Sequence, residues 1–253
     1  MFVKSLSVSI IQCRTKYGNL NQLKHTITSI FSKKNNECDL ILMPEFLFPS
    51  PIDCQEIEGS LITYLQSYAE LMGSWIVCGS VPCISPKGLT QRTYVINDAG
   101  AIAGYYDEIH PGPINIRADS FVSGSSPFLF DMGGTKLAIA TANDLCFPEF
   151  IRSMALAEVA VICLPVFCPI ELKDVLLSML RSRAFENGVF MLLSSGLEEL
   201  TTAVGPDGTI ITTEELPYSP FGEINVEIDL LKAKKMLNFA YNRYARKDIY
   251  FPL

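Results

Sequence analysis

Apolar runs of strand length alternate with apolar stripes at helical spacing along this chain of 253 residues. Residues 5–10 alternate serine with large apolar side chains, and a period of two is typical of a strand. Residues 20–31 carry an apolar stripe at helical spacing, with Asn19 before it as a suitable N-cap. Residues 39–43 form the next apolar run and predict a buried strand. This order predicts an α/β protein.

The same alternation continues through the second half. Further helices are predicted over residues 61–71, 148–158 and 172–186. Further strands are predicted over residues 75–81, 93–97, 101–106, 136–141, 161–164 and 190–193, and residues 209–212 follow a Pro-Asp-Gly turn. Gly73 is placed to end the first of these helices, and Pro165 to stop the strand before it. No Gly/Ser-rich linker separates the halves, so we expect one domain, residues 1–253, with two packed sheets flanked by helices.

Composition and charge exclude several classes of protein. Apolar residues make up 49% of the chain and charged residues 19%, which suits a large core and is too hydrophobic for disorder. A net charge of −7 argues against a nucleic-acid-binding surface. The longest uncharged apolar stretch, residues 159–170, is about half of the ~20 residues that span a bilayer. The amino terminus does not resemble a signal peptide, so we expect no membrane association.

Cysteine and histidine usage predicts a reduced protein without a metal or cofactor. The eight cysteines include no C-x-x-C motif, and several, such as Cys78 and Cys83, lie in apolar strand-like runs. Buried reduced thiols are therefore expected, which implies a cytoplasmic location. With only two histidines, the sequence contains no obvious metal-binding cluster.

Residues 141–149 read T-A-N-D-L-C-F-P-E. This stretch resembles the nucleophile turn of the nitrilase, or carbon–nitrogen hydrolase, superfamily, which is usually written C-Y-D-x-R-F-P-E. With Asp144 aligned, Ala142 stands where the family has its catalytic cysteine, and Cys146 where it has an arginine. A methyl group cannot attack a carbonyl or nitrile carbon. The resemblance therefore points to a hydrolase scaffold that lacks its nucleophile.

Other segments carry the resemblance over roughly residues 3–252. Glu45, in L-M-P-E-F, matches the glutamate that serves the family as general base. Glu108, in Y-D-E-I-H, replaces the catalytic lysine of the Y-x-K-x-H motif. The remaining matches are residues 183–187 with the R-A-x-E-N helix, residues 204–208 with the D-P-x-G turn and residues 246–250 with the R-x-D-L-Y tail. The resemblance implies the family's four-layer α-β-β-α sandwich.

The resemblance also implies what the substitutions would do to catalysis. The family's lysine stabilises the tetrahedral intermediate, whereas a carboxylate at Glu108 would repel its oxyanion. Loss of a single oxyanion donor already costs about 2.7–4 kcal/mol in a protease. A looser alignment places Arg117 at another glutamate position of the family. We therefore predict an ion pair between Glu108 and Arg117; the alternative is that both side chains point to solvent.

Four neighbouring residues have more than one interpretation. Tyr106 and His110 either line a pocket or pack in the core. Asn143 is a candidate binding residue that is also expected to help hold the turn. Cys146 is either a small buried residue or a reactive thiol, because a helix amino terminus lowers the pKa of a thiol.

Three functions fit these residues. The first is a nitrilase-like pseudoenzyme, a cytoplasmic homodimer or larger homo-oligomer, that binds a protein partner or a small amide-, nitrile- or carboxylate-like molecule. The second is an enzyme with a remodelled site in which Glu45 and Glu108 act as acid and base. The third is an ordinary amidase or nitrilase with an engineered cysteine-to-alanine change at Ala142. Several independent departures from the family pattern favour natural loss.

Overall fold

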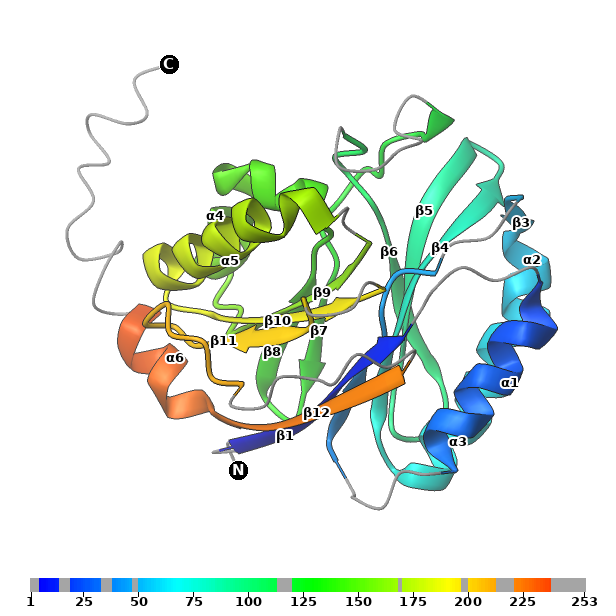
Figure 1. Ribbon diagram of the computed structural model, residues 1–253, viewed down its shortest axis with the longest axis horizontal. Helices are drawn as coiled ribbons and strands as arrows, with labels where there is room; N and C mark the ends of the chain where they lie inside the picture. The colour runs from blue at the N-terminus through cyan, green and yellow to red at the C-terminus, as the bar shows by residue number, and fades with distance from the viewer. Residues whose placement is uncertain are drawn as a thin grey trace.

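Two β-sheets lie face to face, and helices cover both outer faces (Figure 1). The computed structural model describes residues 5–13, 19–32, 38–46, 50–112, 120–167, 170–196, 200–212 and 221–237. Three clusters of buried apolar side chains separate the layers, one between the sheets and one under the helices on each side. The predicted four-layer α-β-β-α sandwich is confirmed.

The first sheet has the strand order β12-β1-β2-β4-β5-β6, with β3 paired to β4. Its strands are β1 (Ser5–Cys13), β2 (Leu40–Leu42), β3 (Ile52–Asp53), β4 (Trp75–Ser85), β5 (Gly88–Ile96), β6 (Ile102–Asp107) and β12 (Phe221–Asp229). β1, β2 and β4 run parallel, so their carboxyl ends meet at one edge of the sheet. β5 and β6 form the predicted hairpin.

The second sheet has the strand order β11-β10-β9-β8-β7. Its strands are β7 (Leu129–Met132), β8 (Thr135–Ile139), β9 (Val161–Val166), β10 (Phe190–Ser195) and β11 (Thr202–Val204). β8, β9 and β10 run parallel, with an antiparallel strand at each edge. Alternate residues of β1, Leu6, Val8 and Ile10, pack against this sheet in the central cluster, as a period of two requires.

The helices place their apolar stripes against the sheets. They are α1 (Leu20–Phe31), α2 (Cys54–Ile57), α3 (Thr63–Met72), α4 (Pro148–Leu156), α5 (Lys173–Asn187) and α6 (Leu230–Leu237). Asn19 caps α1 as predicted, since its side chain accepts from the backbone N–H of Gln22. Gly73, with φ of 60°, ends α3 as predicted. α1 and α3 cover the first sheet, and α4 and α5 the second.

Two predicted boundaries are wrong. The helix predicted over residues 61–71 is preceded without a break by α2 and a π-helical turn (Glu58–Ile62), because the Asp53 side chain caps α2 by accepting from Gln55 N–H. Pro165 lies inside β9 instead of stopping it. β9 pairs with β8 only as far as Cys163. Beyond Cys163, the side of β9 that faced β8 has no neighbouring strand in this pairing, so no backbone N–H is needed there and a proline is tolerated.

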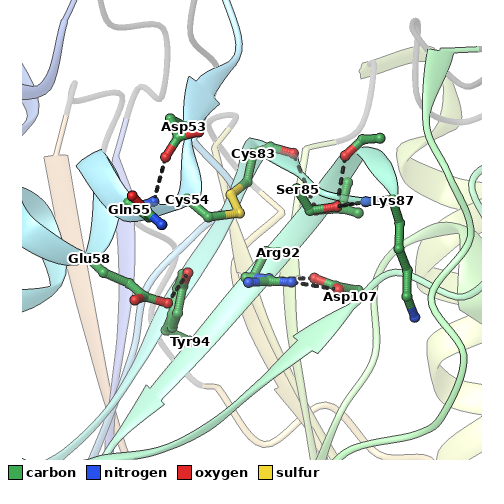
Figure 2. Close-up of a disulfide and its surroundings, with 12 residues drawn as sticks. Asp53, Cys54, Gln55, Glu58, Cys83, Ser85, Lys87, Arg92, Tyr94 and Asp107 are labelled. Atoms are coloured by element: carbon green, nitrogen blue, oxygen red, sulfur yellow. Dashed lines mark hydrogen bonds and ion pairs between the residues drawn. A yellow bond between two sulfur atoms is a disulfide. The ribbon is translucent and has the colours of Figure 1, made fainter.

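The prediction of reduced thiols is also wrong for one pair of cysteines. Cys54 at the start of α2 and Cys83 in β4 form a disulfide, with their Cα atoms 5.3 Å apart (Figure 2). Local sequence patterns could not predict this pairing, because the two cysteines are separated by 29 positions in the sequence. Cys38, Cys78 and Cys163 are buried free thiols, as predicted.

The described helices include none that is both long and apolar enough to cross a membrane.

Candidate functional site

Segments that are far apart in the sequence meet at the carboxyl ends of three strands. Glu45 follows β2, Glu108 follows β6, and Ala142 follows β8. All three are buried, with exposed fractions of 5%, 3% and 4%. Carboxyl ends of strands are where α/β folds usually bind ligands. The candidate site is therefore at the edge of the two sheets where these strand ends lie.

The backbone after β2 is held close to β4, and this positions Glu45. The N–H of Phe46 donates to the carbonyl of Ser80 at 2.8 Å. Gly79 has φ of 78°, and a Cβ atom there would lie 1.9 Å from the carbonyl oxygen of Pro44. Only glycine therefore allows β4 to approach the segment that carries Glu45.

The carboxyl group of Glu45 interacts electrostatically with that of Glu108. Burial raises the pKa of Glu45 well above its ordinary value, and the charge of Glu108 raises it further. The N–H of Phe167 and the hydroxyl of Ser80 lower the pKa, although the hydroxyl makes no hydrogen bond of ordinary geometry with the described residues. The two acids therefore belong to one site.

Glu108 is satisfied at only one of its two carboxyl oxygens. Its Oε1 accepts from Thr141 Oγ1 at 2.6 Å and from Asn143 Nδ2 at 3.0 Å. Its Oε2 is buried and has no hydrogen-bond partner among the residues that the structure describes. Burial raises the pKa of Glu108 to about 7, against the lowering effect of Thr141 and Asn143. Near neutral pH this carboxyl group can both hold and release a proton.

The turn that carries Ala142 presents a methyl group where a nucleophile would stand. Ala142 packs in the apolar cluster beneath α4 and α5, together with Leu145. Residues Asn143–Cys146 form a 3-10 turn after it. The side chain of Ala142 thus contributes no polar atom to the site, whereas its neighbour Asn143 donates to Glu108.

Asp144 holds this turn in place. Its carboxylate accepts from Tyr106 Oη at 2.8 Å and from the backbone N–H of Thr141 at 2.8 Å, and it contacts His110 Nδ1 at 2.7 Å. Tyr106 is buried in the core between the sheets, and His110 stacks on Phe147 with ring centroids 3.9 Å apart. Tyr106 therefore packs in the core, which was the second of its two interpretations. Tyr106 and His110 both hold the turn through their contacts with Asp144.

Cys146 differs from both predictions made for it. The residue is exposed, so it is not a small buried filler. Desolvation and the nearby charge of Asp144 raise the pKa of its thiol, and the charge of Arg183 lowers it, with a net increase. Arg183 Nε instead donates to the carbonyl of Leu145 at 3.1 Å. The R-A-x-E-N segment is therefore hydrogen-bonded to the turn through Arg183. The prediction that the pKa of the Cys146 thiol is lowered is wrong.

Arg117 lies outside the described residues, so its ion pair with Glu108 stays a prediction. Two polar residues in the site were missed from sequence: Thr141, which donates to Glu108, and Ser80, which lies near Glu45. Both interrupt or follow apolar strand runs, and that was the signal available. Within the described ranges, no group of three or more His, Cys, Asp or Glu side chains is arranged to hold a metal ion.

Comparisons with known proteins agree with this architecture. The model of the family described as carbon-nitrogen hydrolase matches residues 7–233. A Staphylococcus aureus protein described as a hydrolase in the agr operon is 26% identical over 247 residues, or 92% of each chain. The crystal structure of a carbon–nitrogen hydrolase from Helicobacter pylori superposes with a TM-score of 0.81, at 17% identity, over 98% of this chain and 97% of that one.

A second similar structure carries a substitution at a cysteine. It is a cysteine-to-alanine mutant of the amidase from Nesterenkonia sp. in complex with butyramide. Its TM-score is 0.73 at 20% identity, over 91% of this chain and 93% of that one. At this level of identity the likeness concerns the fold.

Proposed function

This chain belongs to the carbon–nitrogen hydrolase family, and we propose that it is a pseudoenzyme of that family, which binds a small polar molecule without hydrolysing it through a cysteine. The main support for this proposal is the identity of the residues at two catalytic positions of the family motifs. Ala142 stands at the cysteine position, and the buried carboxyl group of Glu108 stands at the lysine position.

These two residues remove different parts of the family's chemistry. Without a thiolate at Ala142, no covalent intermediate forms there. A tetrahedral intermediate would also carry negative charge beside Glu108, which repels it once the carboxyl group is ionised. Restoring the thiol alone therefore leaves the second obstacle in place.

A capacity for binding is supported by buried polar groups that the rest of the chain leaves without partners. Oε2 of Glu108 and Oγ of Ser80 are two such atoms. Leaving buried polar atoms without hydrogen bonds typically costs about 1–3 kcal/mol each, and a ligand would remove that cost. The butyramide complex of the Nesterenkonia amidase mutant is a precedent, in a similar fold, for ligand binding after cysteine-to-alanine substitution.

The second candidate is an enzyme that uses Glu45 and Glu108 as acid and base without a covalent intermediate. The raised pKa of both groups favours it, because a pair of interacting carboxyl groups can share protons near neutral pH. The candidate differs from the pseudoenzyme in requiring turnover of a substrate by the natural protein.

Other parts of the proposal rest on sequence or family resemblance alone. We propose a single domain over residues 1–253 and a homo-oligomer, and a protein partner remains an alternative occupant of the site. A cytoplasmic location is proposed from the free buried cysteines; the disulfide between Cys54 and Cys83 argues against it.

The test compares ammonia release from butyramide and acyl-enzyme formation, measured by intact mass, in three proteins. The natural protein and Ala142→Cys should both be inactive. Ala142→Cys combined with Glu108→Lys should show measurable turnover, because these residues act as a unit. Ala142→Cys with Glu227→Lys is the matched control, since Glu227 is exposed on β12. Turnover by the natural protein would favour the second candidate, and family-like turnover by Ala142→Cys alone would contradict the role given to Glu108.

A further inference from the structure

Buried polar atoms without partners gather on one face of the first sheet. Ser80 pairs with Thr93, and Thr93 pairs with Tyr106, so the three side chains form a row across β4, β5 and β6. Tyr106 packs in the cluster between the sheets, which places the whole row on the inner face. Ser80 Oγ and Thr93 Oγ1 are fully buried and have no hydrogen-bond partner among the described residues.

Gln91 and Glu108 form a second row of side chains next to the row of Ser80, Thr93 and Tyr106. Gln91 is two residues from Thr93 on β5 and therefore faces the same side of the sheet. The N–H of Glu108 donates to the carbonyl of Gln91 at 2.9 Å, which makes the two residues neighbours. Gln91 Nε2 and Glu108 Oε2 are also buried and lack partners in the described part of the chain. Four neighbouring side chains thus share one unsatisfied region.

The ionisable groups beside this region are carboxyl groups, which are neutral or negative. Glu45 and Glu108 interact electrostatically, and the charge of Asp144 also acts on Glu108. Asp144 is occupied by Tyr106, Thr141 and His110, whereas Oε2 of Glu108 is not occupied. In the described part of the chain neither Glu45 nor Glu108 forms an ion pair. Once ionised, these carboxyl groups would repel an anionic ligand and attract a cationic one.

Arg92, which stands between Gln91 and Thr93 in the sequence, does not balance this charge. It alternates with Gln91 and Thr93 along β5 and therefore points to the opposite face. There its guanidinium group makes two hydrogen bonds to Asp107, at 2.6 and 2.8 Å.

We propose that Glu108 Oε2 and the hydroxyl groups of Ser80 and Thr93 together bind an organic cation with N–H donors, a primary ammonium or amidinium group. Each of the three oxygens can accept a hydrogen bond, and the carboxylate supplies the opposite charge. Gln91 can present its amide oxygen or nitrogen to the same ligand. This inference rests on the proposed function, because the ligand must occupy the site without being hydrolysed.

Binding of such a cation should increase with pH. Ionised Glu108 attracts the cation more strongly than protonated Glu108 does, and the pKa of this group is raised to about 7 by burial. Among the described residues, the other titratable groups near Glu108 are Glu45 and Asp144, with Tyr106 and His110 bound to Asp144. The ionised fraction of Glu108 changes about tenfold between pH 6 and pH 8, and the apparent affinity should follow it.

The experiment is calorimetric titration of the full chain with three probes of nearly equal shape and different charge: butyramidinium, butyramide and butyrate. We expect butyramidinium to bind most tightly, and about tenfold more tightly at pH 8 than at pH 6. Stronger binding of butyramide or butyrate would overturn the inference and leave the proposed function standing. If none of the three bound, both would be overturned.

Three variants connect the probe to these side chains. Glu108→Gln keeps the shape of the side chain and should abolish both the preference for butyramidinium and its pH dependence. Thr93→Val should weaken butyramidinium binding severalfold, because it removes one acceptor. Thr90→Val is the matched control: Thr90 is also buried on β5 but lies on the opposite face, where it donates to the carbonyl of Cys83. Equal effects of the two threonine variants, or an unchanged preference in a folded Glu108→Gln protein, would contradict the assignment.

Discussion

The two faces of strands β4, β5 and β6 differ in whether their buried polar side chains have hydrogen-bond partners. On the outer face, Arg92 is paired with Asp107, and Tyr94 donates to Glu58 at 2.9 Å (Figure 2). On the inner face, Thr93 alternates with these residues along the same strand and has no partner among the described residues. Arg92, Tyr94 and Thr93 are all buried, so exposure of these side chains to water does not explain the difference.

This difference separates groups that stabilise the fold from groups available to a ligand. A buried polar group that is paired within the protein contributes to stability, whereas an unpaired one lowers it. The inner-face groups lie beside Glu45 and Glu108, at the edge where the family motifs meet. We therefore assign the outer face a structural role and the inner face a binding role, and four measurements test that comparison.

The largest expected effect is at the outer-face ion pair. Arg92→Met should lower the free energy of unfolding by about 3 kcal/mol, because it leaves the Asp107 carboxylate without its partner. Urea denaturation measures the loss. The double variant Arg92→Met with Asp107→Leu should recover much of it. A loss below about 1 kcal/mol in the single variant would show that the outer face does not depend on this pair.

The next effect is the pH dependence of stability caused by Glu108. Its folded-state pKa is raised from 4.5 to about 7, so the folded protein binds more protons than the unfolded chain between these values. Stability should therefore fall by up to about 3 kcal/mol as pH rises from about 4.5 to 7. Urea denaturation across this range should show a shallower fall for Glu108→Gln. An identical pH profile would mean that Glu108 is not desolvated.

A smaller loss is expected where a single outer-face hydrogen bond is removed. Tyr94→Phe should cost about 1 kcal/mol, because it deletes the bond to Glu58 and retains the aromatic ring in the core. Thermal unfolding followed by circular dichroism would detect this loss. Unchanged stability would indicate that the hydroxyl of Tyr94 resembles the unpartnered groups of the inner face.

The smallest effect is expected one residue away, on the inner face. Thr93→Val should change the free energy of unfolding by no more than about 0.5 kcal/mol, and in the stabilising direction, because no hydrogen bond is lost. The same thermal measurement, made beside Tyr94→Phe, compares the two faces of β5 directly. A loss equal to that of Tyr94→Phe would remove the distinction between them.

Much of the fold followed from local patterns. Periods of two and of 3.6 residues predicted β1, α1 and the hairpin of β5 and β6, and Asn19 and Gly73 marked helix ends. These signals are readable because strand and helix geometry repeats over neighbouring residues. The family motifs added Glu45, Glu108 and Ala142, which the structure places at three strand ends on one edge.

Long-range pairing decided the remaining features. The disulfide of Cys54, the position of Pro165 inside β9 and the exposure of Cys146 depend on segments that meet only after folding. The same holds for Thr93, whose place on the inner face becomes significant only when β4 and β6 align beside it. The sequence by itself determined the elements and the residue types at the site, since these are local properties. Only the tertiary structure decided which buried polar groups have partners, because a hydrogen bond requires two groups brought together by the fold.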